Sequence, residues 1–303
     1  MTTLLLAILV AFFFPGMIGR VKSIMSGRKG PGVLQPMKNI RVLLRKGSVF
    51  STTTSYIFRI APVVYLSTIL CALLLLPFPG MNGWFGFDGD FIFFAYLLAF
   101  GKFFFILGAM DTGSSFEGMG ANREALYSLL LEPAFFILFG TMALVTGYTS
   151  MASIFTIFSL SDYNSAIIGL IAVYLLVQVA MIENSRMPVD DPKTHLELTM
   201  IHEVMILDHS GFDLALIHIG TALKFAMYGT LIGDILIPAS QPLPIRIMMY
   251  TGIQLTFAAM IGLMESFRAR KKLMKNPQFI VTLTSIALVA FILALLIIHQ
   301  LVQ

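Results

Sequence analysis

The chain has 303 residues, of which 57% are hydrophobic and only 12% are charged. Soluble domains carry about 25% charged residues, so this composition excludes an ordinary soluble enzyme and predicts an integral membrane protein. The net charge of +4 gives no reason to expect a nucleic-acid partner, because the basic residues cluster in loops beside apolar segments. The single cysteine, Cys71, excludes an internal disulfide and a cysteine-ligated metal site within this chain.

Eight apolar segments reach or approach the ~20 residues that a transmembrane helix requires. They lie at residues 4–18, 57–77, 91–110, 125–147, 164–182, 214–238, 247–267 and 279–298. The first is short and is expected to end near Pro15, because proline interrupts helical hydrogen bonds. We therefore predict an all-α fold with eight transmembrane helices, in which residues 1–303 form a single polytopic membrane domain. No internal repeat is evident, which argues against a self-contained secondary transporter.

Basic residues indicate which loops face the cytoplasm. The loop at 20–55 carries eight lysines and arginines and no acidic residue, and the segment at 268–275 carries five more. Such clusters beside a span mark the cytoplasmic side, so eight spans place both termini outside. Within the first loop, apolar residues between 33 and 44 recur at helical spacing, which predicts an amphipathic helix in the membrane interface.

Three charged residues lie well inside predicted spans, away from the span ends: Lys102, Glu132 and Lys224. A charge at the bilayer centre costs about 2.5–3.5 kcal/mol on insertion scales, so each needs a reason to be there. One interpretation is a proton or ion path, and the other is a neutralising salt bridge that fixes helix packing. Glu132 directly precedes Pro133, which removes a backbone donor and leaves a carbonyl available to water or ions.

Seven of the sixteen acidic residues crowd into residues 183–213. They are Glu183, Asp190, Asp191, Glu197, Glu203, Asp208 and Asp213. A helix is expected from about 195 to 208, after two prolines that favour extended chain. Dense carboxylates and histidines titrate as a coupled set, which suits proton handling, whereas the alternative is a solvated loop that docks a partner. The histidines of this stretch recur every seven residues, ~10 Å apart along a helix, so no metal site is predicted.

Three loop motifs resemble those of the complex I subunit 1 family. They are GRKGPGVLQP at 27–36, DTGSSFEGMGANRE at 111–124, and ENSRMPVDDPKTHLELTMIHE at 183–203 followed by LDHSG. The form of the third motif is similar to that of the group 4 membrane-bound nickel–iron hydrogenases, of the hydrogenase-4 and archaeal membrane-bound type. Two departures stand out: Asn122, where these relatives often have serine, and His209, where they often have tyrosine.

The resemblance implies a non-catalytic subunit of an oxidoreductase complex in the plasma membrane of a prokaryote. It would bind no cofactor itself, because the 4Fe-4S clusters and the NiFe (nickel–iron) centre belong to the hydrogenase large and small subunits on the cytoplasmic face. Antiporter-like membrane subunits would be its other partners. The residues that match the family's charged path are Glu132, Glu183, Arg186, Asp190, Asp191, Glu197 and Glu203. To this ion-coupling set we add Lys102, Lys224 and Asp213, and the matching docking residues are Arg28, Lys29, Gln35, Arg123 and Glu124.

Two alternatives to an ion-coupling subunit stay open within this resemblance. The chain is either an ion-coupling subunit, a complex I type subunit that forms a quinone chamber, or a structural scaffold without a transport role. The motifs leave undecided whether the transported ion is H⁺ or Na⁺, which electron donor feeds the complex, and whether the partner keeps its nickel ligands.

Overall fold

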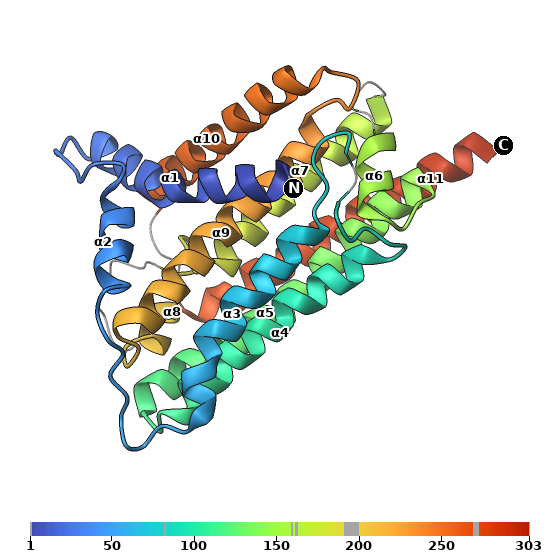
Figure 1. Ribbon diagram of the computed structural model, residues 1–303. Helices are drawn as coiled ribbons and strands as arrows, with labels where there is room; N and C mark the ends of the chain where they lie inside the picture. The colour runs from blue at the N-terminus through green and yellow to red at the C-terminus, as the bar shows by residue number, and fades with distance from the viewer. Residues whose placement is uncertain are drawn as a thin grey trace.

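The computed structural model describes residues 2–81, 83–158, 160, 163–190, 200–268 and 273–302. Within these ranges, eight helices are long and apolar enough to cross a membrane (Figure 1). They are α1 (Thr2–Met25), α3 (Tyr56–Leu75), α4 (Asp90–Asp111), α5 (Ser115–Thr146), α7 (Tyr163–Glu183), α9 (Gly211–Leu236), α10 (Leu243–Phe267) and α11 (Asn276–Val302). The predicted all-α class and the eight spans are confirmed. Shorter helices are α2 (Gln35–Leu43), α6 (Met151–Ile157) and α8 (His202–Met205), and a 3-10 turn covers Leu273–Lys275.

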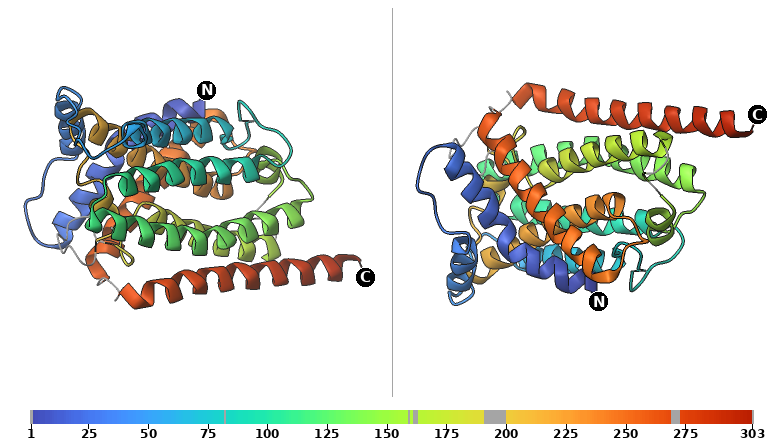
Figure 2. Two further views of the ribbon diagram at one scale, coloured as in Figure 1. Left: turned by 90° about the horizontal axis from the view of Figure 1, so that it is seen from below. Right: turned by 90° about the horizontal axis from the view of Figure 1, so that it is seen from above.

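Helix α9 forms the centre of the bundle. Its most apolar window is 83% buried, whereas no other span exceeds 61%. Helices α1, α3, α7 and α10 all pack on α9, while α4 pairs with α3 and α11 lies on α5 and α7. Helix α11 runs along the edge of the bundle in both views of Figure 2. Helices α2 and α8 lie at one end of the bundle and α6 at the other (Figure 1).

Carboxylates from one helix satisfy the free backbone groups at the start of another. Asp111, at the end of α4, accepts the backbone N–H groups of Ser55 and Phe58 at 2.7 and 3.3 Å. At the other end of the bundle, buried Asp90 accepts the N–H of Met151 at 2.7 Å. The first N–H groups of a helix have no partner within it and carry partial positive charge, so these anions stabilise both helix starts.

Two glycines allow α3 and α4 to pack closely. A Cβ on Gly101 would stand 2.2 Å from the Thr68 hydroxyl, and one on Gly108 would stand 2.9 Å from the Ala61 methyl. Gly101 and Gly108 are two helical turns apart, so they present one face of α4 to α3. Small residues at such crossings bring helix backbones into van der Waals contact, which is the main packing force between helices in lipid.

Several predicted boundaries are wrong. Helix α1 does not end near Pro15 but continues to Met25. A packed membrane helix tolerates the loss of the one backbone hydrogen bond that proline cannot donate. The segment 111–124 is not a loop, since α5 begins at Ser115, and α6 lies in a segment expected to be irregular. Of the helix expected at 195–208, residues 195–199 lie outside the described part, and only His202–Met205 is helical in the rest. Helix α2 falls within the predicted amphipathic segment; its place at a membrane surface stays a prediction.

Candidate ion-coupling site

Four charged side chains from four helices meet in a row, which we call the ion-pair chain. It consists of Glu124 on α5, Lys102 on α4, Glu183 at the end of α7, and Lys224 on α9. The Lys102 Nζ lies 2.9 Å from Glu124 Oε1 and 2.8 Å from Glu183 Oε1, and the Lys224 Nζ lies 2.6 Å from Glu183 Oε2. Each carboxylate oxygen of Glu183 therefore faces a different ammonium group.

The ion-pair chain is buried and balanced. Its side chains are between 2% and 13% exposed, so water screens their charges little. Two carboxylates oppose two ammonium groups, which gives a net charge of zero. Lys224 also donates to the backbone carbonyl of Glu183 at 3.1 Å, at the free end of α7. A buried pair of this kind is strongly destabilised when one partner is removed, because the other charge stays behind without compensation.

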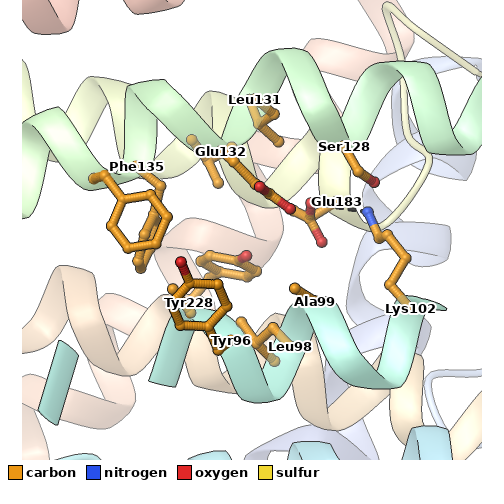
Figure 3. Close-up of a pocket in the computed structure, with 13 residues that line it drawn as sticks. Tyr96, Leu98, Ala99, Lys102, Ser128, Leu131, Glu132, Phe135, Glu183 and Tyr228 are labelled. Atoms are coloured by element: carbon orange, nitrogen blue, oxygen red, sulfur yellow. Dashed lines mark hydrogen bonds and ion pairs between the residues drawn. The ribbon is translucent and has the colours of Figure 1, made fainter. Parts of the chain in front are cut away.

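Glu132 lies beside the ion-pair chain without being part of it. It lines a cavity of about 50 Å³ together with Lys102, Glu183 and Tyr228. In Figure 3 its carboxylate points toward Glu183, and the Lys102 ammonium reaches Glu183 from the other side. The Glu132 side chain is exposed on the single subunit, as is Tyr96 on the same cavity. The cavity therefore links the buried carboxylate of Glu183 to the outer surface of the bundle, with room for a few water molecules.

A second charged cluster joins α1, α10 and the segment after α7. Glu265 on α10 has a fully buried carboxylate, 2.9 Å from the Lys22 ammonium and 3.3 Å from the Arg186 guanidinium. The Arg186 guanidinium also lies over the Phe225 ring, 5.2 Å from its centroid. The predicted coupling residue Arg186 thus forms an ion pair with Glu265. Among the described residues, it forms none with the carboxylates of its own loop.

The acid-rich stretch splits into residues with different surroundings. Asp190 is buried and accepts the backbone N–H groups of Ile201 and His202, both at 3.2 Å, which closes the loop on itself. Glu203 is half-buried on α8, and Asp213 is buried in the first turn of α9. Asp191 and Glu197 lie outside the described residues.

The predicted docking residues are also in different places. Arg28, Lys29 and Gln35 are exposed around the turn before α2. Arg123 is half-buried and donates to the Met200 carbonyl at 3.0 Å, which ties α5 to the acid-rich stretch. Glu124 is buried in the ion-pair chain, so it is not on the surface of this subunit.

Both described histidines of the acid-rich stretch are held neutral at physiological pH. Burial, together with the nearby ammonium of Lys224, lowers the pKa of His202 to about 3. Burial alone lowers the pKa of His209 to about 4. The His209 ring stacks on Phe58, with centroids 4.0 Å apart, and its Nδ1 has no hydrogen-bond partner among the described residues. A charged imidazolium at either place would be poorly solvated.

Replacing His209 with phenylalanine is expected to make the protein less sensitive to acid. The unfolded chain takes up a proton near pH 6.5, but the folded protein takes it up only near pH 4, so His209 destabilises the fold as pH falls through this window. The penalty is negligible at pH 7 and about 2 kcal/mol at pH 5. Thermal unfolding at both pH values checks this, with His202 titrating equally in both proteins. An equal loss of stability in the two proteins would contradict the expectation.

Comparisons with known proteins identify the family of the chain. The family model described as NADH dehydrogenase matches residues 1–298. The chain belongs to the NADH dehydrogenase subunit 1 family. Among its relatives are hydrogenase-4 component C of Escherichia coli (strain K12), 31% identical over 225 residues (74% of this chain and 70% of the relative), and formate hydrogenlyase subunit 4 of the same organism, 28% identical over 232 residues (77% and 75%).

A solved structure shows the same fold. A chain of the membrane-bound sulfane sulfur reductase, an archaeal respiratory membrane complex, superposes with a TM-score of 0.80, at 18% identity and covering 96% of both chains. The family membership expected from the three loop motifs is confirmed. The chain is a multi-pass membrane protein of this subunit 1 family, related to hydrogenase membrane subunits.

Sequence reasoning missed some of the buried polar residues. Glu265 ends a predicted span just before five basic residues, and an acid in that position was the available signal for an ion pair. Asp234 and Gln254 lie inside the described helices α9 and α10, where any polar side chain calls for an explanation. In the part of the chain that the structure describes, no group of three or more His, Cys, Asp or Glu side chains is placed to hold a metal ion.

Proposed function

We propose that the chain is the membrane-anchor and ion-coupling subunit of a redox-driven group 4 hydrogenase complex that pumps protons or sodium ions. It links the hydrophilic hydrogenase module to antiporter-like membrane subunits. The observation that carries this function is the buried ion-pair chain, in which Glu183 is held between two ammonium groups next to a cavity that reaches the bundle surface. The similarity to hydrogenase-4 component C and formate hydrogenlyase subunit 4 supports the choice of complex.

The ion-pair chain can couple events at its two ends through charge balance. Protonation of Glu183 would leave Lys102 and Lys224 facing a neutral group in a buried site, which is unfavourable. Transfer of the proton from Glu183 to another carboxylate restores the charge balance of the site. Glu132 lines the same cavity and can accept that proton. Glu124 lies at the opposite end, next to Arg123 and the acid-rich stretch. A redox event at a partner docked there therefore changes the energy of a proton on Glu183.

The exposed polar side chains indicate which partner each part of the subunit would contact. Glu132 is exposed on α5, eight residues or about 12 Å along the helix from Glu124. A carboxylate on the membrane-facing side of a bundle requires a polar neighbour, which an antiporter-like subunit would provide. On the cytoplasmic side, exposed Arg28, Lys29 and Gln35 form the docking face for the hydrogenase large and small subunits. These partners would hold the 4Fe-4S clusters and the nickel–iron centre, and both termini of this chain would lie outside the plasma membrane.

One observation favours a quinone-binding role as the second candidate. A cavity of about 490 Å³ lies between α1, α2 and α9, lined by apolar side chains and by Arg186, His218 and Thr221. Its size and mixed lining suit a drug-sized amphipathic ligand. Quinone-dependent electron transfer that is inhibited by quinone analogues would favour this role, whereas hydrogen-dependent ion transport without quinone would favour the first.

The complex that forms around the tagged full-length chain tests the first function. Membranes are solubilised gently, the chain is isolated with its partners, and the partners are identified by mass spectrometry. We expect a large subunit with two Cys-x-x-Cys pairs and an antiporter-like subunit, and electron-transfer-driven ion uptake when the complex is reconstituted in vesicles. A complex that transfers electrons but moves no ions would leave the chain as a structural scaffold, and a complex without the large subunit would remove the hydrogenase assignment.

A further inference from the structure

A second buried polar cluster lies between α9 and α10, away from the ion-pair chain. It consists of Thr230 and Asp234 on α9 and of Tyr250 and Gln254 on α10. Asp234 is in the last turn of α9, ten residues or about 15 Å beyond Lys224 along the helix. The cluster is therefore toward the end of the bundle opposite α8 and the acid-rich stretch, which is the predicted outer side.

Hydrogen bonds fix three of the four residues in register. Thr230 Oγ1 donates to the Ala226 carbonyl at 2.8 Å and lies 2.9 Å from the Tyr250 hydroxyl. Gln254 Nε2 donates to the same carbonyl at 2.9 Å and to Thr230 Oγ1 at 3.5 Å. Because Thr230 Oγ1 gives its hydrogen to Ala226, the Tyr250 hydroxyl donates to Thr230. Every donor on these three side chains thus has an acceptor.

The acceptors of the cluster outnumber its donors. Asp234 is 2% exposed, and neither of its carboxylate oxygens has a hydrogen-bond partner among the described residues. The Gln254 Oε1 is also buried without a partner. Buried polar groups are normally satisfied, and an unpaired buried carboxylate is among the most unfavourable of all. Acceptor oxygens in excess are complementary to a cation, and the smallest cation is a proton on Asp234 itself.

The charged groups around Asp234 do not neutralise it. Successive contacts of α9 and α10 pair residue 226 with 254 and 230 with 250, so the next level pairs Asp234 with Arg246. The Arg246 guanidinium instead donates through Nη1 to the Pro79 carbonyl, and its Nε is buried without a partner. Tyr250 is the other titratable group on this face of α10. The outer halves of α1, α3 and α7 carry no charged side chain, and their titratable residues Cys71, Tyr163 and Tyr174 are exposed.

We propose that Asp234 is a proton-binding site on the outer half of the subunit, formed by its own unpaired carboxylate oxygens. Loading forms the O–H bond of the Asp234 carboxyl, and unloading returns that proton to water on the outer side. Arg246, which the register places at the same level, is the cation available to balance the carboxylate when it is unloaded. The site is separate from the ion-pair chain, and its test does not depend on the role of that chain.

Infrared difference spectroscopy of the purified complex tests this site directly. Spectra recorded between about pH 5 and pH 9 are expected to show a neutral carboxyl C=O stretching band that disappears as pH rises. Asp234→Asn should abolish that band, whereas Asp88→Asn, which changes an exposed carboxylate in the outer loop, should leave it unchanged. Tyr250→Phe, one level from Asp234 on α10, keeps the carboxyl and should shift the band, so it reports on the site even if the asparagine variant does not fold.

The contrary outcomes are distinct. A band from Asp234 that persists unchanged over the whole pH range would show a permanently neutral packing residue and would overturn the proton-binding role. A band absent at every pH, or insensitive to Tyr250→Phe, would do the same. A band lost on adding Na⁺ at constant low pH would replace the proton with a sodium ion as the ligand of these oxygens and would overturn the assignment as stated.

Discussion

Glu183→Gln is expected to stop ion transport and to destabilise the subunit by about 3–5 kcal/mol. Glutamine keeps the shape of the side chain but removes the negative charge between Lys102 and Lys224. Lys102 then keeps Glu124 as its partner, whereas Lys224 loses the carboxylate it faces in the ion-pair chain. Ion uptake into vesicles that contain the whole complex measures the first effect, with a pH-sensitive or sodium-sensitive dye. Thermal unfolding of the purified complex measures the second.

A charge-balanced double variant separates the two effects. Glu183→Gln combined with Lys224→Gln leaves the Glu124–Lys102 pair intact and restores a net charge of zero to the ion-pair chain. We expect the double variant to recover most of the lost stability and still to transport no ions, because the carboxylate that exchanges the proton is absent. Recovery of transport together with stability would show that Glu183 has only a packing role.

Glu132→Gln is expected to reduce ion transport to background with almost no loss of stability. Glu132 belongs to none of the ion pairs that the structure describes, and its side chain is exposed on the subunit, so removing its charge should change the stability by less than about 0.5 kcal/mol. The proton on Glu183 would then have no carboxylate to reach through the cavity that the two residues share. Electron transfer and ion uptake measured in one preparation would show the two activities uncoupled.

Two matched substitutions make the result specific. Glu132→Asp keeps a carboxylate on a shorter side chain, and it should retain part of the transport. Asp88→Asn changes an exposed carboxylate in the loop before α4, outside the cavity lining, and it should leave transport normal. Normal transport in Glu132→Gln would remove this residue from the proposed path, whereas loss of assembly in that variant would indicate a structural contact with a neighbouring subunit.

Local sequence patterns predicted the structure correctly where a single physical requirement determined it. Apolar length alone predicted all eight spans, because a helix that crosses a bilayer needs about 20 apolar residues whatever its neighbours are. Boundaries failed where tertiary contacts outweighed local preference. The glycine-rich segment before Glu124 suggested a loop, yet it is helical, with Glu117 accepting the backbone N–H of Asp208 and Glu124 accepting from Lys102. Pro15 lies inside α1 because packing on α9 and α10 maintains the helix around it.

The sequence by itself determined the class of protein, the number of spans, the family and the costly charges Lys102, Glu132 and Lys224 within the membrane. These follow from composition, length and local motifs. Only the tertiary structure decided which charges meet. Lys102 and Glu183 are 81 residues apart, and Arg186 and Glu265 are 79 apart, so no local pattern pairs them. The same holds for Asp234, whose unpaired oxygens are apparent only once α10 is packed beside it, because whether a buried group is satisfied depends on every neighbour in space.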